Sequence, residues 1–66
     1  MRLSREFVGT LKLSKTPAYQ LAVKVGISPY QLSRVVRGML SAERWRKELM
    51  RIGRRLGLKP SEMFVD

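Results

Sequence analysis

Apolar residues recur along this chain at the spacing of amphipathic helices. Near its start, Leu3, Phe7 and Leu11 stand four residues apart and predict a first helix over residues 3–13. The longest pattern predicts a helix over about residues 42–56, on the spacing of Trp45, Leu49, Ile52 and Leu56. With the two shorter patterns between them, these stretches predict an all-α fold.

The two shorter helical patterns cover about residues 17–25 and 29–37. Gly26 follows the first at once, and glycine ends a helix in the left-handed conformation without a steric penalty. Ser28 is expected to cap the second helix with its hydroxyl, and Pro29 suits its first turn. We therefore expect two helices joined by a very short turn.

The first of these two helices has its own start signal. Thr16 is expected to be its N-cap and Pro17 its first helical residue. Because so short a turn forces the helices to cross at a steep angle, the small Ala22 leaves room for the second helix to pack. The pattern is that of a DNA-binding helix-turn-helix, with residues 29–37 as the candidate recognition helix.

The outer side of the helix at 29–37 carries a polar stripe at helical spacing, formed by Tyr30, Ser33, Arg34 and Arg37. Arginine can bind guanine through two hydrogen bonds, serine can donate or accept, and a tyrosine ring can pack on a thymine methyl group. An ordinary solvated face is the alternative interpretation. Beside a turn of this kind, we expect the stripe to read DNA.

Further features of the predicted 42–56 helix concern its ends and its packing. Ser41 is expected to cap it, while Met39 and Leu40 are expected to tuck into the core. Gly53 is unfavourable inside a helix, so it is expected to mark the close approach of another helix.

The chain is strongly basic. Its 66 residues include 14 Lys and Arg against 5 Asp and Glu, a net charge of +9, which predicts attraction to a polyanion such as nucleic acid. Tyr19 and Gln20 are expected to approach the DNA backbone, and Arg44 is the expected phosphate contact at the start of the 42–56 helix. The other basic residues of that helix cannot all touch one duplex and are expected to act through long-range attraction.

Length and composition exclude several classes of protein. A chain of 66 residues predicts a single domain over 1–66, and without Cys or His it offers no disulfide, no zinc site of the usual kind and no histidine base. The few acids are scattered and no glycine-rich phosphate loop is present, so we expect no enzyme, metal, cofactor or small-molecule ligand. No apolar run approaches the roughly 20 residues that span a bilayer, and no signal peptide is evident, so we expect a cytoplasmic protein.

The chain resembles the lambda-repressor-like, or Xre/Cro-type, helix-turn-helix family over nearly its whole length. The resemblance is carried by Leu21-Ala22, Val25-Gly26-Ile27-Ser28, Leu32-Ser33-Arg34, Arg37-Gly38 and the stretch from Ile52 through Leu58 to Met63-Phe64. It implies a compact five-helix domain that inserts its third helix into the DNA major groove, as bacterial and phage regulators do. The base-reading positions that it implies are Ser28, Pro29, Tyr30, Ser33, Arg34 and Arg37.

Two positions depart from the family pattern. The family often places a phosphate-clamping Gln where this chain has Ala18, so that the clamp is missing or is replaced by Tyr19. Pro29 stands where the family often has a polar residue, and proline cannot donate a hydrogen bond. Base readout is therefore expected to rest more on Tyr30 and the residues that follow it.

The function expected from these features is that of a sequence-specific regulator that binds double-stranded DNA, most simply a repressor. One alternative is a protein-interaction module, such as an antitoxin that also binds DNA. Another is a membrane-active amphipathic helix at residues 42–56, although its narrow apolar stripe is needed for the core. At the C-terminus, Met63, Phe64 and Val65 either fold back on the core or form a homodimer contact; a monomer on a single site and a dimer on a palindrome both fit.

Overall fold

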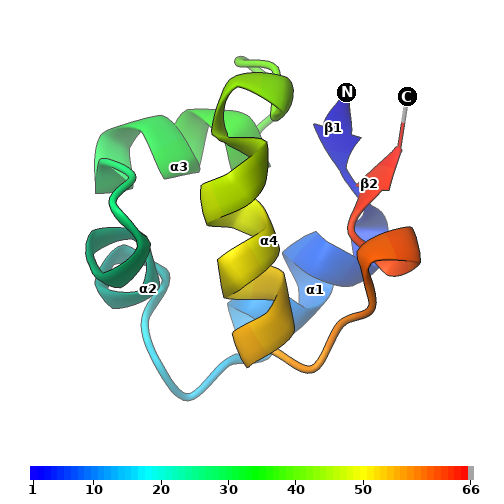
Figure 1. Ribbon diagram of the computed structural model, residues 1–66. Helices are drawn as coiled ribbons and strands as arrows, with labels where there is room; N and C mark the ends of the chain where they lie inside the picture. Colours follow the sequence, from blue (N-terminus) through cyan, green and yellow to red (C-terminus); the bar gives the residue numbers. More distant parts are fainter. Residues whose placement is uncertain (66) are drawn as a thin grey trace.

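A computed structural model describes residues 1–65 of the chain (Figure 1). This part contains four α-helices, two 3-10 helices and two short strands. In chain order the elements are β1 (Arg2–Leu3), α1 (Arg5–Leu13), α2 (Ala18–Val25), α3 (Pro29–Val36), η1 (Glu43–Trp45), α4 (Arg46–Arg55), η2 (Pro60–Glu62) and β2 (Phe64–Val65). The expectation of a mostly helical fold is confirmed, whereas the two strands are an addition.

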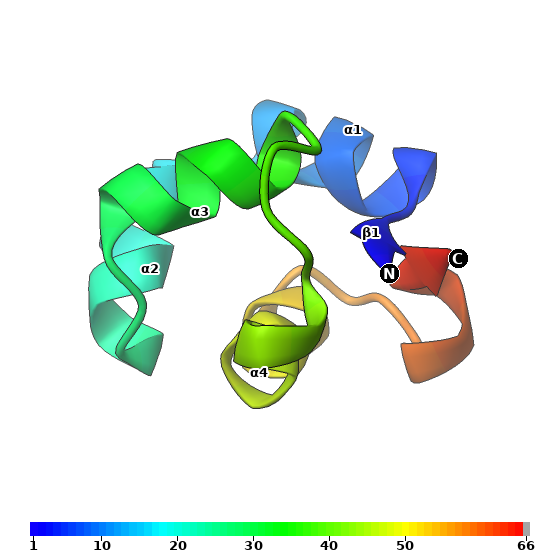
Figure 2. The same cartoon turned by 90° about the horizontal axis from the view of Figure 1, so that it is seen from above.

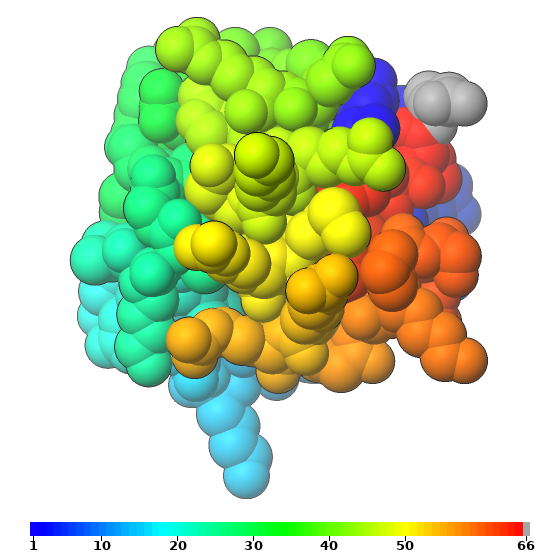
Figure 3. All heavy atoms as spheres, viewed as in Figure 1, coloured from blue at the N-terminus to red at the C-terminus, as the bar shows by residue number. Residues whose placement is uncertain are grey.

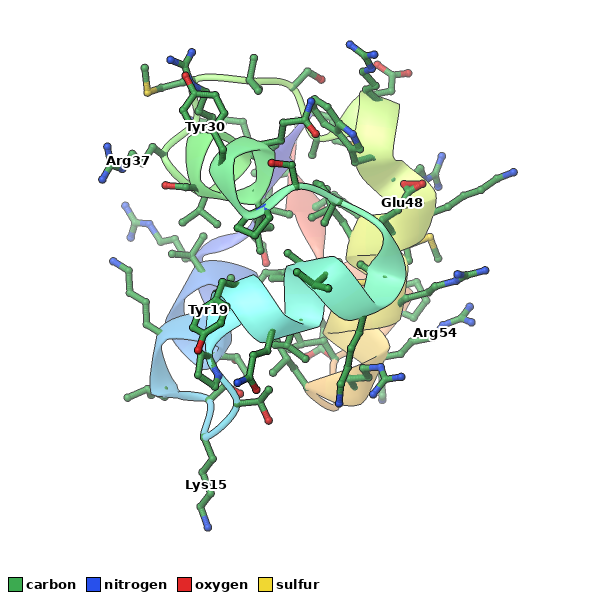
Figure 4. The ribbon with its side chains drawn as sticks, turned by 90° about the vertical axis from the view of Figure 1, so that its left-hand side faces the viewer. Lys15, Tyr19, Tyr30, Arg37, Glu48 and Arg54 are labelled. Carbon is green, nitrogen blue, oxygen red and sulfur yellow. The ribbon has the colours of Figure 1, made fainter. Side chains whose placement is uncertain are left out.

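Three helices run in three different directions around the core. In Figure 1, α3 lies across the view, α4 runs down it and α2 is seen along its axis, and the quarter turn of Figure 4 exchanges the views of α2 and α3. Figure 2 shows α1 beside the C-terminal end of α3, with α4 on the opposite side of the molecule. Helix α2 contacts both α3 and α4, so it lies between these two helices in the packing.

The buried side chains form one cluster that draws on every α-helix. Phe7 and Leu11 come from α1, and Leu32 and Val35 from α3. The predicted inward positions are mostly confirmed, but Met39 is 59% exposed where the sequence predicted burial. Met39 follows a left-handed glycine at the end of α3 and its N–H caps that helix, which leaves its side chain outside.

The turn between α2 and α3 follows the prediction from Gly26. This residue has φ +91°, and the N–H of Ile27 donates to the carbonyl of Ala22 at 3.0 Å, which closes the end of α2. Ile27 is buried and anchors the turn in the core. The two helices are thus joined by a fixed connection, and Ala22 is fully buried near their crossing.

The start of α2 and the end of α3 each differ from the prediction by one residue, whereas the end of α2 and the start of α3 are as predicted. Helix α2 begins at Ala18, because Pro17 keeps an extended backbone (ψ 144°) and is itself the N-cap, so Thr16 is not. Helix α3 ends at Val36, and Arg37 is its C-cap. Ser28 is the N-cap of α3 as predicted, but its hydroxyl makes no capping hydrogen bond.

The predicted long helix at residues 42–56 is divided in two. A 3-10 turn, η1, precedes α4, because Trp45 takes φ −112° and ψ 27°, outside the α-helical region. The N-cap of η1 is Ala42 and that of α4 is Trp45, so the prediction of Ser41 as the cap is wrong. The hydroxyl of Ser41 still accepts from the N–H of Glu43 at 3.2 Å, just before the 3-10 turn. No helix in the described residues is long and apolar enough to span a membrane.

The C-terminal segment folds back on the core. The predicted fifth helix is only the 3-10 turn η2, after which β2 pairs with β1 in antiparallel register, Arg2 opposite Val65. Met63 is completely buried, and a Cβ atom at Gly53 would lie 2.7 Å from its Cε, so Gly53 admits this side chain and not a helix. Of the terminal apolar residues, Val65 is exposed and Phe64 is partly buried.

Ser4 connects the two ends of the fold. Its N–H donates to the carbonyl of Met63 at 2.8 Å and its hydroxyl donates to the carbonyl of Glu62. The same hydroxyl accepts from the N–H of Phe7 at 3.0 Å, which confirms Ser4 as the cap of α1. This buried residue therefore fixes the start of α1 against the C-terminal segment.

Candidate nucleic-acid interface

The outer stripe of α3 presents an aromatic ring and a guanidinium group that contact each other. Tyr30 is 65% exposed, and the guanidinium carbon of Arg34 lies 4.7 Å from the centre of its ring. The two residues stand four apart on the helix, so the contact follows from helical geometry. A cation held over an aromatic face has fewer side-chain conformations, so it loses less conformational entropy when it binds a ligand.

A groove between α1, α2 and α3, here called the helix groove, runs beside this stripe. It encloses about 310 Å³ and is lined by Leu11, Lys12, Ala18, Tyr19, Pro29, Leu32, Ser33 and Val36. Three of the predicted site residues, Tyr19, Pro29 and Ser33, are thus brought together around one opening. Ala18 lines it with a methyl group.

A second hollow, here called the arginine groove, lies between the C-terminal end of α3 and the start of the chain. It encloses about 630 Å³, and its lining among the described residues includes three arginines, Arg2, Arg5 and Arg37, with a single acid, Glu6. Val36 lines both grooves, so the two are neighbours along α3.

Sequence reasoning missed Lys12, Arg2 and Arg5 as members of this surface. In the sequence, Lys12 is explained by its place in the last turn of a helix, where a positive charge is favourable, and Arg2 and Arg5 belong to no motif. Their positive charge was the only available signal. Their position beside α3 depends on how α1 and β1 pack, which no local pattern reports.

Three of the predicted site residues share one side of the molecule. In Figure 4, Tyr19, Tyr30 and Arg37 point to one side, while Glu48 and Arg54 of α4 point to the other. Figure 3 shows the far side, where the segment containing α4 covers the middle of the surface. One straight duplex lying against Tyr30 and Arg37 therefore does not reach Arg54.

The remaining predicted contacts lie away from the grooves. Gln20 is exposed on α2 but lines neither groove, and Ser28 is exposed at the start of α3. Arg44 is exposed on η1, and its guanidinium carbon lies 5.2 Å from the centre of the Trp45 ring. Its side chain is thereby held beside the ring at the start of α4.

The described residues contain no group of three or more acidic, His or Cys side chains close enough to hold a metal ion. Comparison with protein-family models, with curated proteins and with solved structures gives no match to this chain. The candidate interface consequently rests on its own geometry and charge.

Proposed function

We propose that this chain is a helix-turn-helix regulator that binds double-stranded DNA and places α3 in the major groove. The observation that carries the proposal is the single face of α1, α2 and α3. Here the Tyr30–Arg34 pair lies beside the helix groove, which contains Lys12, and the arginine groove, which contains Arg2, Arg5 and Arg37. A major groove admits an α-helix, and its base edges match Arg, Ser and Tyr side chains. This proposal includes membership of the lambda-repressor-like family and, most simply, action as a repressor.

Base readout is assigned first to Arg34. Its guanidinium carbon lies 4.7 Å from the centre of the Tyr30 ring, and a guanidinium fork can donate to the two acceptors of a guanine edge. Ser28 keeps its hydroxyl free of capping and Ser33 is exposed, so both can donate to a base or to a phosphate. Pro29 lacks an N–H and contributes shape and apolar contact.

Phosphate contacts are assigned to residues around this stripe. Tyr19 stands at the helix groove with Lys12, and Gln20 lies next to it on α2. Arg44 is kept as a contact at the start of α4, while Arg54 and its basic neighbours on the far side attract DNA from a distance. Because phosphate contacts release counterions, affinity should fall steeply as salt rises.

Two alternatives are a partner-binding module and a homodimer that forms through the terminal residues. Fewer apolar residues are exposed for either contact than the sequence suggested. Met63 is inside the core, and Phe64 is partly buried against the ring of Phe7, 6.4 Å away between ring centres. Val65 is the exposed member of this group. These alternatives therefore remain second to DNA binding.

The proposal is tested by selecting bound duplexes from a random pool and then measuring variants on the selected site. Wild type should enrich one sequence motif. Arg34→Ala should cost about 1–3 kcal/mol and relax preference at one base pair, whereas Arg44→Ala should weaken specific and random duplexes alike. Arg54→Ala, on the far side, is the matched control and should change binding least.

Two results would contradict parts of the proposal. If no motif is enriched and all duplexes bind equally, α3 does not read sequence. If Arg34→Ala lowers binding to the selected and to the random duplex by the same factor, Arg34 is a phosphate contact and the base-reading role lies elsewhere on α3.

A further inference from the structure

We propose that the arginine groove is a phosphate-binding subsite that holds the DNA backbone beyond the C-terminal end of α3. This inference rests on the proposed function, and it assigns Arg2, Arg5 and Arg37 a common ligand: consecutive phosphates of the strand that flanks the recognition helix. It also moves Arg37 from base reading to backbone binding.

The three arginines come from three separate segments that meet around one hollow. Arg2 lies in β1, Arg5 begins α1 and Arg37 is the C-cap of α3. All three are exposed, and Glu6 is the one acid in the lining among residues 1–65, which the structure describes. Among these residues three guanidinium groups stand against one carboxylate, and the guanidinium fork suits phosphate oxygens.

The backbone that carries Arg2 and Arg5 is held in place before any ligand binds. Between them, Ser4 is fixed to the C-terminal segment by hydrogen bonds from both its N–H and its hydroxyl. Arg2 also stands in the β1–β2 pair, where Leu3 points into the core and Arg2 outward. A fixed backbone lowers the ordering entropy that binding would otherwise cost.

The C-terminal end of α3 repels a phosphate in this groove less than a helix end with unpaired carbonyl groups would. The N–H groups of Arg37, Gly38 and Met39 donate to the carbonyls of Ser33, Val35 and Arg34, at 3.1, 3.0 and 2.8 Å. Hydrogen bonding satisfies these carbonyls, which would otherwise be unpaired negative ends at the C-terminus of α3. The guanidinium of Arg37 then adds positive charge at the same end.

The position of the groove favours a nucleic-acid backbone over an acidic peptide. Val36 lines both grooves, so the arginine groove continues the face that carries Tyr30 and Arg34. Arg37 points to the same side as Tyr30 and Tyr19 (Figure 4). A duplex seated on α3 would lie over this hollow, and its strand presents a regular row of phosphates to the arginines.

The test compares two double variants with the same change in charge. Arg2→Gln with Arg5→Gln removes two groove cations, and Arg54→Gln with Arg55→Gln removes two exposed cations of α4. Binding to the selected and to a random duplex is measured over a range of salt concentrations. The groove variant should weaken binding to both duplexes by about tenfold or more. It should also lower the slope of log affinity against log salt concentration by about two. The α4 variant should change both the affinity and this slope less.

Arg37→Gln completes the test, because it should weaken both duplexes equally and leave base preference unchanged. Replacing single phosphates of the selected site by neutral methylphosphonates locates the partner: wild type should lose affinity at the phosphates beyond the end of α3, and the groove variant should not. Thermal unfolding of each variant checks that the fold is retained.

The inference is overturned if the groove variant binds DNA no worse than the α4 variant, or if Arg37→Gln changes which base is preferred. A groove variant that keeps DNA binding but loses capture of an acidic peptide would show a protein ligand instead. If wild type enriches a motif under either result, the proposed function stands and only the subsite fails. If wild type binds no duplex at all, both fall.

Discussion

Replacing Gly53 by alanine tests how the C-terminal segment is held against α4. Glycine inside a helix costs about 1 kcal/mol relative to alanine, so an open position would gain stability from the change. At Gly53 the new Cβ would lie 2.7 Å from the Cε and 2.8 Å from the Sδ of Met63. Met63 is completely buried, so its side chain can move only by displacing its neighbours.

The two effects have opposite signs, and their sizes can be compared. Forcing extra volume into a packed core costs about 1–3 kcal/mol, against a propensity gain of about 1 kcal/mol. We therefore expect Gly53→Ala to lower the free energy of unfolding by up to about 2 kcal/mol. In a domain of this size, 1 kcal/mol corresponds to a Tm change of about 4–8 °C.

The measurement is thermal and urea unfolding of the single variants and of a double variant that also carries Met63→Leu. Leucine lacks the terminal methyl that the Cβ would meet, so Gly53→Ala should cost less in that background. Gly9→Ala in α1 is the control: nothing lies within 4 Å of its Cβ, and it should stabilise by up to about 1 kcal/mol. If Gly53→Ala stabilises as much as Gly9→Ala, Met63 does not occupy this space.

Two further substitutions test the fold around the candidate interface. Ser4→Ala should lower the free energy of unfolding by about 1–3 kcal/mol, because the N–H of Phe7 and the carbonyl of Glu62 lose their hydrogen-bond partner. Unchanged urea unfolding would show that these hydrogen bonds do not stabilise the fold. Ala22→Leu should cost about 1–3 kcal/mol by separating α2 from α3, and a variant of wild-type stability would show that their crossing is loosely packed.

Local patterns predicted three of the four α-helices and most of the core. The spacing of Leu3, Phe7 and Leu11 predicted a helix over residues 3–13, of which α1 occupies 5–13, and Gly26 marked the turn between α2 and α3. These predictions succeed because helical periodicity and glycine conformation are properties of neighbouring residues.

Local patterns predicted the ends of helices less well. Thr16 was expected to be the N-cap and Pro17 the first helical residue, but Pro17 keeps an extended backbone and is itself the N-cap. The predicted helix at 42–56 is interrupted at Trp45.

For the candidate site, the sequence by itself determined which residues stand on the outer stripe of α3. Tyr30 and Arg34 are four residues apart on a helix, so their contact is implied by the sequence once the helix is known. Their role in binding DNA remains a prediction. The charge of the chain likewise predicts a polyanionic partner, but charge alone does not say which arginines share a surface.

The tertiary structure alone decided what lies beside that stripe. Arg2 and Arg5 line a groove with Arg37 because β1 pairs with β2 and Ser4 binds the C-terminal segment across 58 residues of sequence. Arg54 faces the other side because α4 packs on α2 with its apolar stripe inward. Such placements depend on contacts between distant segments, and no local pattern of residues encodes them.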